Sequence, residues 1–166
     1  FADSPLRPRG LYQRCHLHFL FGHEEAAVRD ALVFLERYPS LPLAADVRMW
    51  LGDFHADRAE RLHAASGPGE ETELPENARA EYLEAVTYYL DVEVNHPGSP
   101  RRARALYDAA RVRNRLGDRD GAERLLVRLL ADRGWVAEDG ETLGRSLLLL
   151  AVFPASQQGF LAALRQ

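Results

Sequence analysis

The chain has 166 residues, of which 46% are hydrophobic and 28% are charged, and its formal net charge is −4. This is the composition of a globular domain rather than of a disordered chain, and the negative charge disfavours nucleic acid as a partner, because phosphate binding needs a dominant basic face. The longest apolar run, residues 147–153, is too short to cross a bilayer, and the single cysteine, Cys15, excludes an internal disulfide. We therefore expect one domain, residues 1–166, without a transmembrane segment.

All 21 basic residues are arginine, and the chain has no lysine and no isoleucine. This bias is typical of a GC-rich genome and points to a bacterial source. The chain starts at Phe1, with Pro5 and Pro8 close behind, which fits either a removed signal peptide or a removed preceding domain. The sequence leaves both alternatives open.

The first predicted unit, residues 8–39, consists of two helices separated at Gly22. Glycine makes a tight turn without the steric cost that a side chain has at positive φ, and Pro39 ends the unit because it lacks an N–H. The second helix, Glu24 to Tyr38, has apolar residues at helical spacing, at Ala27, Ala31, Phe34, Leu35 and Tyr38.

The second predicted unit, residues 45–97, has the close-packing pair Leu51-Gly52 on its first helix. Its second helix shows helical spacing from Ala80 to Val94, with apolar residues at Leu83, Val86, Leu90 and Val94. From Asp46 to Ala85 there are 39 positions, whereas the matching interval of the third unit, Arg104 to Ala122, has 18. The difference of 21 predicts an insertion near residues 58–79, where the Gly/Pro/Glu-rich stretch SGPGEETELPEN lies, as a lid, a docking element or a loop.

The third predicted unit, residues 103–134, has Leu106 and Ala110 on its first helix, Gly117-Asp118 at the turn and Ala122 on its second helix. A proline-rich spacer precedes both this unit and the second one. Its residues repeat 58 positions apart, pairing Pro39 with Pro97, Pro42 with Pro100 and Ala45 with Ala103. Two further helices, Thr142 to Val152 and Ser156 to Leu164, are predicted within residues 141–165 as a capping pair or the start of a fourth unit.

Repeated helix pairs of about 34 residues are typical of tetratricopeptide arrays, and the chain resembles that family over its three units. The resemblance implies an all-α fold, an α-α superhelix of about three helix pairs with a C-terminal capping pair. The spacers ERYPSLP and NHPGSP are similar to those of the bacterial envelope subfamily, which includes the outer-membrane assembly lipoprotein and the periplasmic cell-division coordinators. This suggests a periplasmic or outer-membrane-associated protein, although cytoplasmic arrays use the same spacer.

In the family, the first helix of each pair lines a concave surface that binds the partner. Carried over by position, the candidate residues form an aromatic, then an acidic, then a basic group along that surface. They are Arg9, Tyr12, His16 and Phe19 in the first unit, Asp46, Met49 and Asp53 in the second, and Arg104, Tyr107, Arg111, Asn114 and Arg115 in the third.

Arg104, Tyr107, Arg111 and Arg115 follow one stripe of a helix, where arginine forks suit the carboxylates of an acidic protein or peptide partner. The alternative is a solvated face, or one neutralised by the acidic segment Glu70 to Glu93. The stripe lacks the lysine and asparagine pattern of the family's carboxylate clamp, which disfavours recognition of a chaperone C-terminus.

Cys15, His16, His18 and His23 form a cluster that resembles a metal site but lacks converging geometry on a helix, and His23 does not begin an HExxH motif. We expect Cys15 and His18 to face the core and the others to face solvent. His55, at the matching position of the second unit, supports a packing role. No nucleophile elbow, phosphate-binding loop or dinucleotide motif is present, so we expect no enzyme activity, cofactor or metal.

The sequence therefore predicts a non-catalytic scaffold that binds a partner segment within a multi-protein bacterial assembly. The alternative is a helical docking or dimerisation subdomain of a larger protein, because the apolar C-terminal residues 147–166 favour burial against another chain or domain. Arg113 occupies a position that normally packs on the neighbouring pair, so its stem is expected to lie along the apolar groove or its head to pair with an acid of the previous unit.

Overall fold

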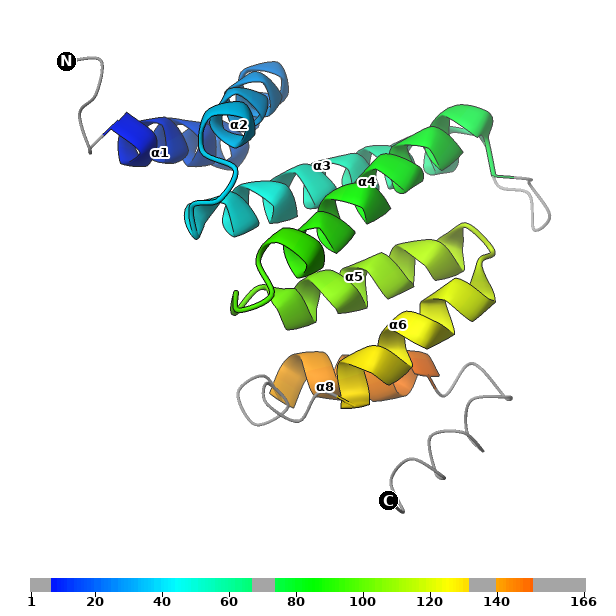
Figure 1. Cartoon of the computed structure of the whole chain (residues 1–166). Coiled ribbons are helices and arrows are strands. Elements are labelled where there is room, and N and C mark those ends of the chain that lie inside the picture. The colour runs from blue at the N-terminus through cyan, green and yellow to red at the C-terminus, as the bar shows by residue number, and fades with distance from the viewer. Residues whose placement is uncertain (1–6, 67–73, 132–139, 151–166) are drawn as a thin grey trace.

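The computed structural model describes residues 7–66, 74–131 and 140–150, and every regular element in these ranges is an α-helix. Figure 1 shows the helices following one another from one end of the molecule to the other. Each packs on its neighbours in the chain, an arrangement consistent with an α-helical superhelix, and the predicted all-α class is confirmed. The helices are α1 (Arg7–Leu20), α2 (Glu24–Arg37), α3 (Leu43–Ala65), α4 (Glu76–Asn95), α5 (Arg102–Arg115), α6 (Arg119–Ala131) and α8 (Gly140–Leu150).

Gly22 and Gly117 make the turns inside the first and third pairs. Their φ angles are 70° and 81°, the left-handed region that the sequence predicted for both. After the second turn, the Asp118 Oδ1 atom accepts a hydrogen bond from the backbone N–H of Gly121 at 2.9 Å, which satisfies one free donor at the start of α6. These two turns fix where α2 and α6 begin.

The core has two parts, which meet at α3. The smaller part lies between α1, α2 and α3 around Phe34 and Leu51, and the larger one spans α3 to α6 around Tyr89 and Leu126. Gly52 lets α3 and α4 approach, since a Cβ atom there would lie 2.5 Å from the Cε1 atom of Tyr89. The close packing predicted from Leu51-Gly52 is therefore present.

The buried face of α4 includes only some of the apolar residues that recur at helical spacing. Val86 is buried, whereas Leu83 and Val94 are 54% and 74% exposed. Helical spacing alone allows two overlapping faces, and the one that carries two large rings and several small residues is the buried one. It consists of Ala78, Tyr82, Ala85, Val86, Tyr89 and Val92.

Residues 58–79 mostly lengthen the second helix pair. With 23 and 20 residues, α3 and α4 are the longest helices described. Glu81 of α4 joins the two helices, because it accepts a hydrogen bond from His55 at 2.7 Å and forms an ion pair with Arg58 at 3.1 Å. The predicted insertion is thus partly helical, and its residues 67–73 lie outside the described ranges.

At the C-terminal end, α8 contacts both α5 and α6. It covers most of the predicted helix at residues 142–152, whereas the one predicted at residues 156–164 lies outside the described ranges. Among the described helices, none combines the length and the apolar character needed to span a bilayer.

Candidate partner-binding surface

The predicted site residues lie on α1, α3 and α5, the first helix of each pair. We use the term first-helix face for the surface formed by Tyr12, His16, Phe19, Asp46, Trp50, Asp53, Arg104, Arg111 and Arg115. Asp46 of α3 links all three helices, because its carboxylate accepts a hydrogen bond from the Tyr12 hydroxyl at 3.2 Å and one from Arg101 Nε, just before α5, at 2.5 Å. Arg115 of α5 also forms an ion pair with Glu60 of α3, at 3.3 Å.

At the α1 end of this face, Trp50 is the centre of an aromatic cluster. Its ring stacks on His16 with 4.8 Å between centroids and 6° between planes. Tyr12 and Phe19 lie against the same indole, at centroid distances of 4.9 and 5.7 Å. Three residues predicted separately on α1 therefore meet on one side chain of α3.

The Tyr12 hydroxyl is held in its donating form. Partial burial and then the negative charge of Asp46 raise the pKa of Tyr12 to about 12. At neutral pH the phenol therefore stays protonated and keeps donating to the carboxylate. This contact orients the ring against Trp50.

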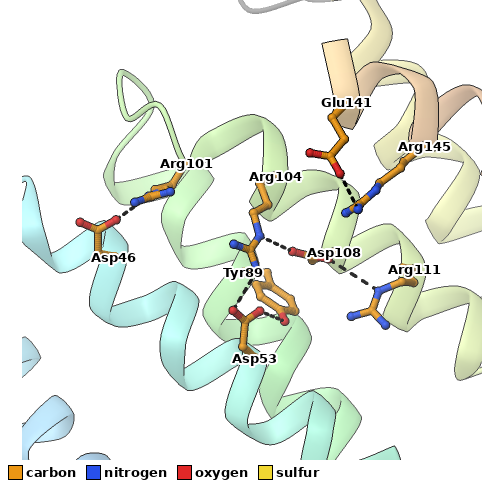
Figure 2. A network of polar contacts seen from close by, with 9 residues as sticks. All are labelled: Asp46, Asp53, Tyr89, Arg101, Arg104, Asp108, Arg111, Glu141 and Arg145. Carbon is orange, nitrogen blue, oxygen red and sulfur yellow. Dashed lines mark hydrogen bonds and ion pairs between the residues drawn. The ribbon is translucent and has the colours of Figure 1, made fainter. Parts of the chain in front are cut away.

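Between α3 and α5 lies an arginine–carboxylate network, drawn in Figure 2. Asp53 accepts hydrogen bonds from the Tyr89 hydroxyl at 2.8 Å and from Arg104 at 3.0 Å. Arg104 also donates to Asp108 at 3.2 Å, and Arg111 lies 3.6 Å from the second oxygen of Asp108. One arginine thus bridges a carboxylate of α3 and a carboxylate of its own helix.

Burial dominates the electrostatics of this network. It raises the pKa values of both Asp53 and Asp108. Tyr89 and Arg104 act in the opposite direction on Asp53, and Arg111 and Arg104 do so on Asp108, because each favours the charged carboxylate. Burial and then the neighbouring carboxylates also raise the pKa of Tyr89. The hydrogen bonds and ion pairs therefore offset only part of the cost of burying the two carboxylates, while they fix the positions of the arginine heads.

Not every predicted residue reaches the first-helix face. Met49 is only 3% exposed and packs in the core, so its assignment to a partner-binding surface was wrong. Tyr107 is half-buried against the core, and Asn114 is also half-buried. Arg9 is exposed at the start of α1.

Trp50 is the main residue that the sequence analysis missed. It lies four positions after Asp46 and three before Asp53, so helical periodicity places it on the same stripe. Choosing Met49 instead shifted the predicted face by one residue, about 100° around the helix. Asp108 was missed because a buried carboxylate on an otherwise apolar face gives no sequence signal of its own.

The arginine stripe is neutralised, but not mainly by the segment that the sequence suggested. Its partners are the carboxylates of α3 and of α5 described above. The acidic segment pairs with arginines outside the stripe, since Glu93 lies 3.4 Å from Arg102 and 3.0 Å from Arg128. Arg113 pairs with Asp118 of its own unit at 3.1 Å, so an acid of the previous unit was the wrong partner.

The cysteine–histidine cluster packs rather than converges. Cys15 is fully buried, and burial raises the pKa of its thiol to about 12. His18 is half-buried, with its Nδ1 atom 3.3 Å from Nδ1 of His23 and its Nε2 atom 3.7 Å from Asp30. Over the described ranges, no group of three or more His, Cys, Asp or Glu side chains could hold a metal ion.

Comparisons of the chain with protein-family models, with curated proteins and with solved structures find no match in any of the three. The resemblance to tetratricopeptide arrays therefore depends on the sequence motifs alone. Functional inference for this chain rests on its own side chains and on how the helices arrange them.

Proposed function

We propose that the chain is a non-catalytic tetratricopeptide-like scaffold that holds a segment of a partner protein on its first-helix face. The observation that carries the proposal is the position of Asp46, which contacts Tyr12 of α1 and Arg101 at the start of α5. Through this residue the exposed sides of three helices become one surface, long enough for an extended or helical segment.

The chemistry of this surface suits protein binding. Tyrosine, tryptophan and arginine are enriched among the residues that dominate interface energies. Although they are paired within the chain, the side chains of Arg111 and Arg115 remain 40% and 56% exposed. These two arginines can therefore bind an acidic group of the partner at the α5 end of the face.

The setting of this scaffold is a further part of the proposal. The proline-rich spacers and the arginine-only composition favour a bacterial multi-protein assembly, and the spacer resemblance favours one associated with the envelope. A cytoplasmic assembly is the alternative.

Site-specific photo-crosslinking tests the proposal. A benzophenone amino acid replaces His16 on the first-helix face or, as the matched control, Thr87, which is exposed on α4. After irradiation with a bacterial extract, we expect discrete adducts from position 16 and none of the same proteins from position 87. Identical adducts from both positions would contradict a role for the first-helix face.

The alternative function, docking or dimerisation through the C-terminal helices, has one observation in its favour. Leu148 of α8 is 74% exposed, which suits contact with another apolar surface. Sedimentation of the chain and of Leu148→Gln distinguishes the two functions. A dimer that the substitution dissociates favours docking through α8, whereas a monomer at all concentrations favours the scaffold.

A further inference from the structure

A small cavity opens beside Trp50, where the turn between α1 and α2 meets α3. We call it the Trp50 cavity. Its volume is about 240 Å³, and aromatic rings of Phe19, Trp50 and Phe54 line it. Phe19 and Trp50 come from two helices and lie against each other in the aromatic cluster, with 5.7 Å between ring centroids, so this part of the wall is in place before any ligand arrives. Preorganised walls of this kind reduce the entropy lost on binding.

The remaining lining of the Trp50 cavity is acidic. Glu24, Asp53 and Asp57 contribute three carboxylates, against the single guanidinium of Arg61. Arg61 is already bound to Glu24 at 3.1 Å. Asp57 is exposed, and no ion pair to it is found among the described residues. The cavity thus combines aromatic faces with an excess of negative charge.

We propose that the Trp50 cavity binds one lysine or arginine side chain of the partner segment. A cation is attracted to the faces of aromatic rings, most strongly to that of tryptophan, and Asp57 supplies a carboxylate at the rim. This inference deepens the proposed function and rests on it, because it names the chemistry of one residue of the bound segment. The cation enters at the α1 end of the first-helix face, opposite the exposed arginines of α5.

Other side chains fit the cavity less well. A carboxylate would meet the unpaired charge of Asp57, and the nearby guanidinium groups of Arg61 and Arg104 are already engaged by Glu24 and Asp53. An aliphatic side chain would satisfy the rings but would desolvate the carboxylate of Asp57 without replacing its contact with water. Only a cation on an apolar stem matches both the rings and the acids.

Selection from a random 12-residue peptide library on phage, at physiological salt, tests this inference. We expect the selected peptides to share a lysine or arginine. In a synthetic copy of the tightest peptide, replacing that arginine with citrulline, or that lysine with norleucine, should weaken binding about tenfold, because the ring contact and the ion pair are lost together. Calorimetry gives the affinities.

Variants of the chain then locate the site. Asp57→Asn removes one rim charge and should weaken binding about fivefold, and Phe19→Leu, which keeps an apolar side chain, should do the same. Glu84→Gln, an exposed acid on α4, is the matched control for non-specific attraction and should leave the affinity unchanged. Selected peptides that bind the first-helix face but contain no basic residue would overturn the inference and leave the proposed function standing. A library that yields no binder would overturn both.

Discussion

The guanidinium of Arg48 donates to Nε2 of His96 at 3.0 Å, and this contact joins the two proline-rich spacers. The same Nη1 atom lies 3.3 Å from the carbonyl oxygen of Pro39 in the first spacer. Both side chains are buried. Because a guanidinium has no acceptor, His96 must accept at Nε2 and is therefore neutral. Arg48 of α3 thus makes one joint with both spacers, through the Pro39 carbonyl of the first and the His96 ring of the second.

This joint predicts a pH dependence of stability. Burial and then the charge of Arg48 lower the pKa of His96 below its ordinary value of 6.5. Between the two values the unfolded chain binds a proton and the folded chain does not, so the free energy of unfolding falls as the pH drops below about 6.5. Urea unfolding at about pH 7.5 and 5.5 should show a smaller loss for His96→Gln than for the wild type. The control is His63→Gln, a substitution outside the joint. If His63→Gln reduced the pH-dependent loss of stability as much as His96→Gln does, the assignment to His96 would be contradicted.

Two glycines predict opposite effects of the same substitution. Gly52→Ala should lower the free energy of unfolding by about 1–3 kcal/mol, because the new methyl group displaces the Tyr89 ring and its hydrogen bond to Asp53. Gly144→Ala, with nothing within 4 Å of the added Cβ, should raise it by about 0.5–1 kcal/mol through helix propensity. Urea midpoints at constant m-value measure both, and a neutral Gly52→Ala would show that the α3–α4 contact is not tight.

Many of the helix boundaries and close contacts could be predicted from the positions of glycine and proline in the sequence. Gly22, Gly52 and Gly117 stand where a turn or a close approach allows no side chain, so their sequence positions predicted their structural roles. The helical period was weaker evidence, because it gives a face only to within one residue. The positions carried over from the family resemblance were off by one residue on α3, so they placed Met49 on the surface and missed Trp50. Ion pairs between helices, such as Arg104 with Asp53, depend on tertiary packing and have no local signal.

The side chain of Asp118 should stabilise the turn between α5 and α6. Asp118→Ala removes the acceptor for the N–H of Gly121 and the partner of Arg113, and should cost about 1 kcal/mol of stability. Asp118→Asn keeps the capping oxygen and should restore most of that loss. Thermal unfolding of the two variants separates the cap from the charge, and equal losses would assign the effect to the ion pair.

Arg104 should stabilise the protein more than Arg115 does, although both are half exposed. Arg104 contacts Asp53 and the buried Asp108, whereas Arg115 pairs with the accessible Glu60 alone among the residues that the structure describes. Arg104→Gln leaves two carboxylates less compensated and should cost about 1–2 kcal/mol near neutral pH, while Arg115→Gln should stay within about 0.5 kcal/mol.

The pH dependence of that difference identifies its cause. Arg104 stabilises the ionised carboxylates, whose pKa values burial raises, so its contribution disappears as Asp53 and Asp108 take up protons. The stability difference between wild type and Arg104→Gln, measured by urea unfolding, should therefore shrink as the pH falls through the raised pKa values of the two carboxylates. A difference that stays constant down to pH 4 would mean that Arg104 acts through packing of its stem. Arg104 would then be available for substitution in binding experiments on the first-helix face, whereas the electrostatic outcome restricts such experiments to Arg111 and Arg115.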